Sequence, residues 1–268
     1  MEIKSNSNQL NTRTLRIYEK EIAKYRRNYL SMYGSLEDAD SETGIFAYSS
    51  LCFPRYVKSV YSLRLHFSAL KYWYKSNAGK DLKISTSGHN FKREKILYIE
   101  EDEIKTITEK IENHVVKSIL LLVYYTGARL ADILKVKVSD YSYEKKQIYI
   151  FDEKNNILRT LPIPVTMNYL LFRETHDKNI CDYLFTLKKS HSISPRTVQK
   201  YLQKAVSSHN DISLTVSSLR YNFIIFLIHQ GFDSNEIKDY MGYKTVKSIR
   251  RHHSLPHKKE SKILKIYG

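Results

Sequence analysis

The sequence predicts a mainly helical protein with one small antiparallel sheet, an α+β fold. Apolar residues recur with a helical period in several separated segments of the 268-residue chain. Strand-forming residues that alternate or cluster are confined to one stretch, residues 136–163. Hydrophobic residues make up 42% of the chain, which is enough to give a core to each of two modest domains.

Two helices are predicted near the N-terminus. Residues 13–33 carry a broad apolar stripe, with basic residues on the rest of the surface. A second helix is predicted over residues 55–75, because Pro54 suits the first turn of a helix. Aromatic and basic side chains interleave along this second helix. One interpretation is that the aromatic side chains pack in a core while the basic side chains face solvent. The other is that the basic side chains contact phosphates. We expect both, since the cations are free to reach outward.

A change in composition marks the domain boundaries. Residues 76–95 are rich in Ser, Gly, Asn and Lys and show no sustained period, which indicates a linker. We therefore expect a basic helical domain over residues 1–80, a linker over residues 81–97 and a second domain with a basic tail over residues 98–268.

The second domain is predicted to combine a buried helix with the small sheet. The acidic patch Glu100–Glu103 suits the first turn of a helix, where negative charge is preferred. Residues 115–125 are apolar nearly all round, which predicts a buried central helix. Three strands are predicted over residues 136–138, 147–151 and 157–163.

Capping residues delimit three further helices. Ser194, followed by proline, opens a helix that ends near residue 206. Thr215 caps a helix over residues 216–230, and a short helix over residues 234–241 ends before Gly242.

The net charge of +16 favours a polyanionic partner, most often nucleic acid, over a merely solvated lysine-rich surface. The first 95 residues carry 17 basic and 9 acidic side chains, so that half of the excess charge lies in the first third of the chain. A protein that surrounds a nucleic-acid duplex with two domains would carry positive charge on both of them in this way.

Several classes of protein are excluded. The two cysteines, Cys52 and Cys181, cannot build a disulfide framework and lack the spacing of a zinc site. The longest apolar runs fall far short of the roughly 20 residues that cross a bilayer, and the N-terminus has no signal peptide. We therefore expect a cytoplasmic, DNA-associated protein with no membrane partner. No EF-hand, P-loop or HExxH motif occurs, so we expect no cofactor and no metal.

Three separated segments carry the candidate chemistry. YYTGARLADIL presents Arg129 at the start of a helix, with Asp132 three residues later. FDEKNN holds Lys154 in the turn between two predicted strands. VSSLRYNF places Arg220 inside an otherwise apolar helix, and a buried arginine needs an anionic partner or ligand.

In order, spacing and surroundings these segments resemble the tyrosine recombinases, also called phage integrases, over roughly residues 97–255. TGAR-x-x-D is similar to the first arginine motif of that family. Leu219-Arg220-Tyr221 is similar to the second arginine box, and Met241-Gly242 to the leucine-glycine-histidine box. The resemblance implies an N-terminal helical DNA-binding domain followed by a domain with the recombinase catalytic fold.

The resemblance also implies roles for individual residues. Such a recombinase attacks one DNA phosphodiester with a tyrosine hydroxyl and needs no metal or ATP. Arg129 and Arg220 would clamp the non-bridging oxygens of the attacked phosphate. Lys154 would serve as the general acid near the leaving oxygen. Asp132 would orient an arginine or support its helix.

Three positions depart from the family's pattern. Ser217 stands where the second box begins with histidine, and Tyr243 stands where the third box has histidine or tryptophan. His252 stands where the nucleophilic tyrosine is expected. No neighbouring group can replace a missing covalent step. We therefore expect a DNA-binding protein of phage, plasmid or other mobile DNA that keeps the phosphate-binding set but does not cut DNA.

The alternative is an active site-specific recombinase with a displaced nucleophile, which leaves open whether the chain is an enzyme. Tyr267 is the strongest candidate for that nucleophile, although it lies fifteen residues beyond the expected place. Tyr243 suits phosphate binding through its hydroxyl better than attack, and His252 would have to form a phosphohistidine. An RNA-binding or scaffolding protein is a third hypothesis, against which the buried arginine argues.

The expected partners are double-stranded DNA, further copies of the chain as a dimer or tetramer on DNA, and a partner recombinase. Residues 244–265 hold eight Lys or Arg and one acid, which fits a solvated tail, a DNA-contacting helix or the family's subunit-swapping tail. The cations expected to contact DNA are Arg55, Lys58, Arg64, Lys71, Lys75, Lys92, Arg93, Lys244, Arg250 and Arg251.

Overall fold

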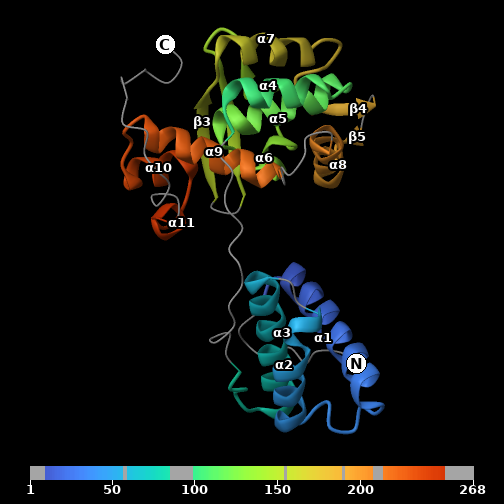
Figure 1. Ribbon diagram of the computed structural model, residues 1–268. Helices are drawn as coiled ribbons and strands as arrows, with labels where there is room; N and C mark the ends of the chain where they lie inside the picture. The colour runs from blue at the N-terminus through green and yellow to red at the C-terminus, as the bar shows by residue number, and fades with distance from the viewer. Residues whose placement is uncertain are drawn as a thin grey trace. The chain divides into compact units, whose positions relative to one another are not determined.

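The computed structural model describes residues 10–56, 59–84, 99–153, 156–188, 191–207 and 214–250 (Figure 1). The chain divides into two compact units, Met1–Glu94 and Lys95–Gly268, and the division falls inside the segment 81–97. Each unit has its own hydrophobic core, so each is able to position side chains independently of the other.

The described part of the N-terminal unit holds three helices around an aromatic core. They are α1 (Thr12–Tyr33), α2 (Glu42–Tyr56) and α3 (Val60–Ala78), and α1 packs against α3. Tyr25 is fully buried, and its hydroxyl donates a hydrogen bond to the carbonyl of Ala39 at 2.6 Å. The polar end of this ring is therefore satisfied inside the core.

The helix predicted over residues 55–75 is wrong at its start. Pro54 lies in the last turn of α2, a helix that is not among those predicted from the sequence. At that place a proline removes only one hydrogen bond from the end of a helix, so it does not have to begin a new one. α3 begins after Ser59, whose hydroxyl accepts a hydrogen bond from the amide of Ser62 at 3.2 Å.

A buried histidine in this core lies against a carboxylate. Nδ1 of His66 is 2.9 Å from Oε2 of Glu21, while its Nε2 has no partner among the residues described. Burial lowers the pKa of His66, and this outweighs the hydrogen bond and the negative charge of Glu21, which raise it. Protonation of both ring nitrogens of His66 would leave the N–H at Nε2 buried without a hydrogen-bond acceptor among the described residues.

Acidification is expected to destabilise the N-terminal unit, because below about pH 6.5 the unfolded chain binds a proton that folded His66 does not take up. The free energy of unfolding should fall by up to about 1.4 kcal/mol per pH unit. Trp73, the single tryptophan of the chain, is buried in the same core, so its fluorescence reports urea unfolding of this unit. His66→Phe should flatten the pH dependence, and His176→Phe, at an exposed position of the other unit, should not. A wild-type midpoint that is constant between about pH 7 and pH 5 would contradict the prediction.

The C-terminal unit is built around the predicted central helix. α5 (His114–Thr126) is buried nearly all round. It packs against α4 (Glu101–Glu109), α7 (Val165–Glu174), α8 (Pro195–Val206) and α9 (Val216–His229), which Figure 1 shows around it. A helix with apolar neighbours on several sides has no polar face, in accord with its sequence.

The first residue described in this unit is fixed by two of those helices. Ile99 is fully buried, and its amide donates to Oδ1 of Asn222 on α9 at 2.6 Å. The hydroxyl of Tyr124 on α5 donates to the carbonyl of Ile99 at 3.2 Å. Both backbone polar groups of this buried residue are therefore satisfied. The predicted acidic first turn follows directly, at Glu101–Glu103 of α4.

The predicted sheet is present. β2 (Gln147–Asp152) and β3 (Ile157–Pro162) form an antiparallel hairpin, and β1 (Tyr141–Ser142) pairs with the other edge of β2. A second small pair is formed by β4 (Thr186–Lys188) and β5 (His191–Ser192).

The strand predicted over residues 136–138 is wrong. Lys137 makes only an isolated bridge with Tyr183, and Val138 begins the 3-10 helix η1 (Val138–Asp140). Val136 is buried in the core of the unit, so its apolar character reflects burial rather than a ladder of strand hydrogen bonds.

The capping residues locate the later helices as predicted. The hydroxyls of Ser194 and Thr215 accept hydrogen bonds from amides in the first turns of α8 and α9. α10 (Ser234–Met241) ends at Gly242, which has a φ of 65°. None of the helices in the described ranges is long and apolar enough to cross a membrane.

Candidate functional site

A glycine in the left-handed region places Arg129 beside the end of the central helix. Gly127 follows α5 with a φ of 59°, and the next amide, that of Ala128, donates to Oγ1 of Thr126 at 3.2 Å. Arg129 then occupies the N-cap position of α6 (Leu130–Ile133), at the start of a helix as the sequence predicts. The chain thus turns sharply between a buried helix and the arginine.

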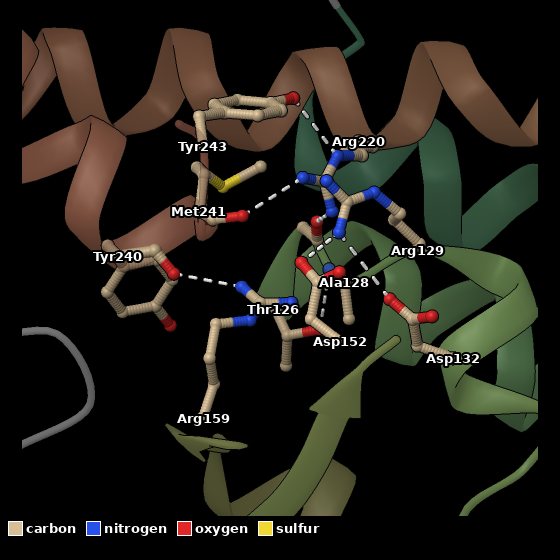
Figure 2. Close-up of polar contacts among 11 residues, drawn as sticks. Thr126, Ala128, Arg129, Asp132, Asp152, Arg159, Arg220, Tyr240, Met241 and Tyr243 are labelled. Carbon is tan, nitrogen blue, oxygen red and sulfur yellow. Dashed lines mark hydrogen bonds and ion pairs between the residues drawn. The ribbon is translucent and has the colours of Figure 1, made fainter. Parts of the chain in front are cut away.

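Arg220 projects from α9 into a ring of acceptors (Figure 2). Its Nη1 donates to the carbonyl of Gly127, and its Nη2 donates to the carbonyl of Met241 at 3.2 Å. Its Nε donates to the hydroxyl of Tyr243 at 3.2 Å. Burial lowers the pKa of Arg220, and the hydroxyl of Tyr243 opposes this effect. A guanidinium nonetheless keeps its proton, so Arg220 is a buried cation with further N–H donors beyond the three in use.

One aromatic ring faces both predicted arginines. The centre of the Tyr243 ring is 5.0 Å from the guanidinium carbon of Arg220 and 6.0 Å from that of Arg129. An arginine at this distance from a tyrosine ring is attracted by the electrons of the ring. The side chain of Arg129 is 21% exposed, so a ligand can reach it from solvent.

Two buried carboxylates hold Arg129 from the protein side. Its Nη1 forms an ion pair with Oδ2 of Asp152, at the end of β2, and lies 3.7 Å from Oδ2 of Asp132. Burial and the negative charge of Asp152 raise the pKa of Asp132, while the charge of Arg129 lowers it. The carboxylates therefore fix the orientation of Arg129.

A third arginine, which is not among the predicted site residues, lies in the same cluster. Arg159 of β3 is 6% exposed, and its Nη1 donates to the carbonyl of Tyr240 at 2.9 Å (Figure 2). Its Nε and Nη2 have no hydrogen-bond partner in the described part of the chain. Arg159 lies on the same buried face of β3 as Leu161. A cation at an inward position of an alternating strand is the signal that would have revealed it.

The cluster carries an excess of positive charge. Three guanidinium groups, those of Arg129, Arg159 and Arg220, lie with the carboxylates of Asp132 and Asp152. With both carboxylates ionised the net charge is +1, so one monoanionic group placed at Arg129 balances it. No group of three His, Cys, Asp or Glu side chains within the described ranges is placed to hold a metal ion.

The structure brings together three of the predicted catalytic residues, Arg129, Arg220 and Tyr243. Ser217 lies exposed in the first turn of α9. Seven of the predicted residues lie outside the described part of the chain: Lys58, Lys92, Arg93, Lys154, Arg251, His252 and Tyr267.

The other predicted DNA-contacting cations lie on α2 and α3 of the N-terminal unit or after Tyr243 in the C-terminal unit. Arg64, Lys71 and Lys75 are exposed on α3. Lys244 is exposed and directly follows Tyr243. Arg55 belongs to the last turn of α2, and Arg250 is the last residue of α11 (Lys247–Arg250).

A basic stripe on α8 was not predicted. Arg196, Lys200 and Lys204 are spaced four residues apart, which puts them on one face of the helix, and all three are exposed. α8 contains no acidic residue. The stripe therefore presents uncompensated positive charge.

Sequence comparison finds relatives that are named tyrosine recombinases. The chain is 27% identical to tyrosine recombinase XerA of Pyrococcus horikoshii over 201 residues, which cover 72% of this chain and 68% of that protein. It is 29% identical to XerA of Pyrococcus furiosus over 160 residues, which cover 56% of this chain and only 54% of that protein.

Solved structures share the fold. A lambda integrase tetramer bound to a Holliday junction matches 95% of this chain and 76% of its own chain, with 17% identity and a TM-score of 0.67. The Tn1549 transposon integrase in complex with transposon right end DNA matches 91% of this chain and 95% of its own chain, with 12% identity and a TM-score of 0.66. The predicted fold class, a helical N-terminal domain with a mainly helical recombinase-type domain, is confirmed.

The family model described as the phage integrase family matches residues 98–257. This range contains the whole cluster, from Gly127 to Tyr243, and more than half of the chain. The resemblance that the arginine motifs indicated is therefore confirmed, and the chain belongs to the phage integrase family.

Proposed function

We propose that this protein binds double-stranded DNA of phage, plasmid or other mobile DNA without cutting it, and seats one backbone phosphate at Arg129 and Arg220. The observation that carries the proposal is that these two guanidinium groups face one tyrosine ring in a cluster of net charge +1. A phosphodiester has one negative charge and therefore complements the cluster. Membership of the phage integrase family supports DNA as the source of that phosphate.

The geometry suits a phosphate oxygen for a specific reason. Arg129 is the more accessible arginine, and its guanidinium can donate in parallel to two non-bridging oxygens. Arg220 lies behind it and has N–H donors beyond those bound to Gly127, Met241 and Tyr243. The hydroxyl of Tyr243 accepts a hydrogen bond from Arg220 and retains its own proton, which it can donate to a phosphate oxygen.

The absence of cutting is proposed from the residues at three positions. Ser217 cannot act as the histidine that the family usually has there, and Tyr243 replaces the histidine or tryptophan of the third box. His252 replaces the tyrosine that forms the covalent link to DNA. Lys154 would then bind the backbone as a cation rather than protonate a leaving group.

Exposed cations supply the surface that would follow the DNA backbone. Arg64, Lys71 and Lys75 lie on α3, and the α8 stripe is Arg196, Lys200 and Lys204. Such cations contact phosphates and set the register of a protein on a duplex. We propose that binding occurs as a dimer or tetramer, together with a partner recombinase that supplies strand cleavage; a tetramer is the form named for the lambda integrase structure.

The second candidate function is that of an active recombinase whose nucleophile is Tyr267. The observation that favours it is that the sequence relatives are named tyrosine recombinases. This function requires the hydroxyl of Tyr267 to reach the phosphate held by Arg129, because a nucleophile acts only within hydrogen-bonding distance of its reaction centre.

One experiment separates the two functions. The protein is incubated with nicked suicide duplexes made from DNA that flanks its own coding sequence, and the mixture is denatured before electrophoresis. We expect no denaturant-stable adduct but salt-sensitive binding in a native assay, with a log–log slope of roughly −0.9 per neutralised phosphate. A slope near zero would refute DNA binding.

An adduct would refute the proposal that the protein does not cut. If Tyr267→Phe then abolished the adduct while Tyr61→Phe, at an exposed tyrosine of α3, left it intact, the active recombinase would be the correct function. Loss of the adduct with His252→Gln instead would identify a phosphohistidine.

A further inference from the structure

The third arginine of the cluster is placed where it cannot touch a ligand. Arg159 is 6% exposed, and its one hydrogen bond in the described part of the chain goes to the backbone carbonyl of Tyr240. Burial lowers the pKa of Arg159, and so does the positive charge of Arg220, whereas the charge of Asp152 raises it. Burying two cations this close together costs free energy, so a nearby negative charge must offset that cost.

Arg159 lies near the carboxylate that binds Arg129, close enough for the charge of Asp152 to act on it. A β-carbon added to Gly242 would lie 3.1 Å from Cδ of Arg159 and 3.1 Å from Oδ2 of Asp152. The same oxygen of Asp152 pairs with Nη1 of Arg129. Asp152 therefore lies between two cations, one buried and one partly exposed.

We propose that Arg159 is a positioning residue that compensates the charge of Asp152, so that Arg129 keeps its attraction for a phosphate. Asp152 and Asp132 alone would neutralise Arg129 and Arg220, and the cluster would have no net charge to offer an anion. Arg159 restores a net charge of +1 from a place that no ligand reaches. The inference rests on the proposed function, because it concerns how that site attracts its phosphate.

Arg159 has a second action through the backbone. Its hydrogen bond to the carbonyl of Tyr240 ties β3 to the end of α10. The next residue, Met241, gives its carbonyl to Arg220, and Tyr243 gives its hydroxyl. The buried arginine thus fixes the turn that orients Arg220.

A double-mutant cycle that neutralises one charge at a time tests the compensating role. Arg159→Met lowers the net charge of the cluster to 0, Asp152→Asn raises it to +2, and the double variant returns it to +1. Dissociation constants for a mixed-sequence duplex are measured by fluorescence anisotropy at one salt concentration. The amide oxygen of an asparagine at position 152 can still accept a hydrogen bond from Nη1 of Arg129, so the Asp152→Asn change removes the charge and keeps the contact that orients Arg129. We therefore expect binding about tenfold weaker for Arg159→Met, about tenfold tighter for Asp152→Asn, and close to wild type for the double variant. Rescue by removal of a second group is not expected of a residue that only supports the fold.

Controls distinguish failure of this inference from failure of the proposed function. Arg173→Met, the same substitution at an exposed arginine of α7, should change binding less than threefold. If the wild type binds DNA, Arg220→Met weakens binding by about 100-fold, and the cycle shows no change, then compensation by Arg159 is refuted while the site stands. If Arg159→Met does not fold, the double variant is compared with Asp152→Asn, and it should bind about tenfold more weakly. Equal affinities of these two variants would overturn the inference.

Discussion

Arg220→Met is expected to weaken binding to duplex DNA by about 100-fold, because hydrogen bonds to charged groups contribute about 1.5–3 kcal/mol. The substitution removes a cation and leaves the carbonyls of Gly127 and Met241 without the hydrogen bonds that Arg220 gives them. It also frees the hydroxyl of Tyr243. Affinity is measured by fluorescence anisotropy at fixed salt, after circular dichroism has shown that the variant is folded.

Two matched variants sharpen this result. Arg220→Lys keeps the charge but cannot donate to three acceptors at fixed angles, so we expect it to recover only part of the lost affinity. Lys71→Met removes one exposed cation of α3 and should weaken binding by less than about tenfold. If Arg220→Met bound DNA no more weakly than Lys71→Met, the cluster would not be the phosphate site.

Gly127→Ala is expected to destabilise the C-terminal unit by about 3 kcal/mol. The φ of 59° is unfavourable for any residue with a β-carbon, and that carbon would lie 2.6 Å from Cδ1 of Phe223. It would also lie 3.0 Å from the end of the Met241 side chain. Since Phe223 belongs to α9, the clash pushes α9, which carries Arg220, away from the end of α5. Urea unfolding followed by far-ultraviolet circular dichroism measures the loss.

The control for this clash is another glycine with a positive φ. Gly231 has a φ of 85°, and nothing lies within 4 Å of an added β-carbon. Gly231→Ala should therefore lower the free energy of unfolding by only about 1 kcal/mol, the backbone part of the effect. Unfolding monitored through Trp73, which belongs to the other unit, should be unchanged in both variants. Equal losses for the two glycines would show that the contact with Phe223 does not matter.

The sequence predicts the elements whose signals are local. Ser194 and Thr215 satisfy amides within their own first turns, and Gly242 ends a helix by its own backbone conformation. The position of Arg129 after a helix-ending glycine is local in the same sense. The prediction of a strand over residues 136–138 is wrong because a short apolar run has the same sequence pattern whether it packs on a core or forms a strand.

The missing members of the site depend on distant contacts. Arg159 meets the carbonyl of Tyr240, 81 residues later, and Arg129 meets Asp152, 23 residues later. In sequence Asp152 is a polar residue next to a turn, and nothing nearby marks it as a partner for an arginine. α7 was also missed, because Val165, Tyr169 and Phe172 are apolar but exposed, and they blur the helical period.

The anchoring of Ile99 has a structural consequence. Asn222 holds the amide of Ile99 and lies two residues after Arg220 on the same helix. The hydrogen bond that satisfies the amide of Ile99 and the hydrogen bonds of Arg220 therefore depend on the position of the same helix, α9. A substitution that displaces α9 is thus expected to disturb both the start of this unit and the arginine that faces the phosphate.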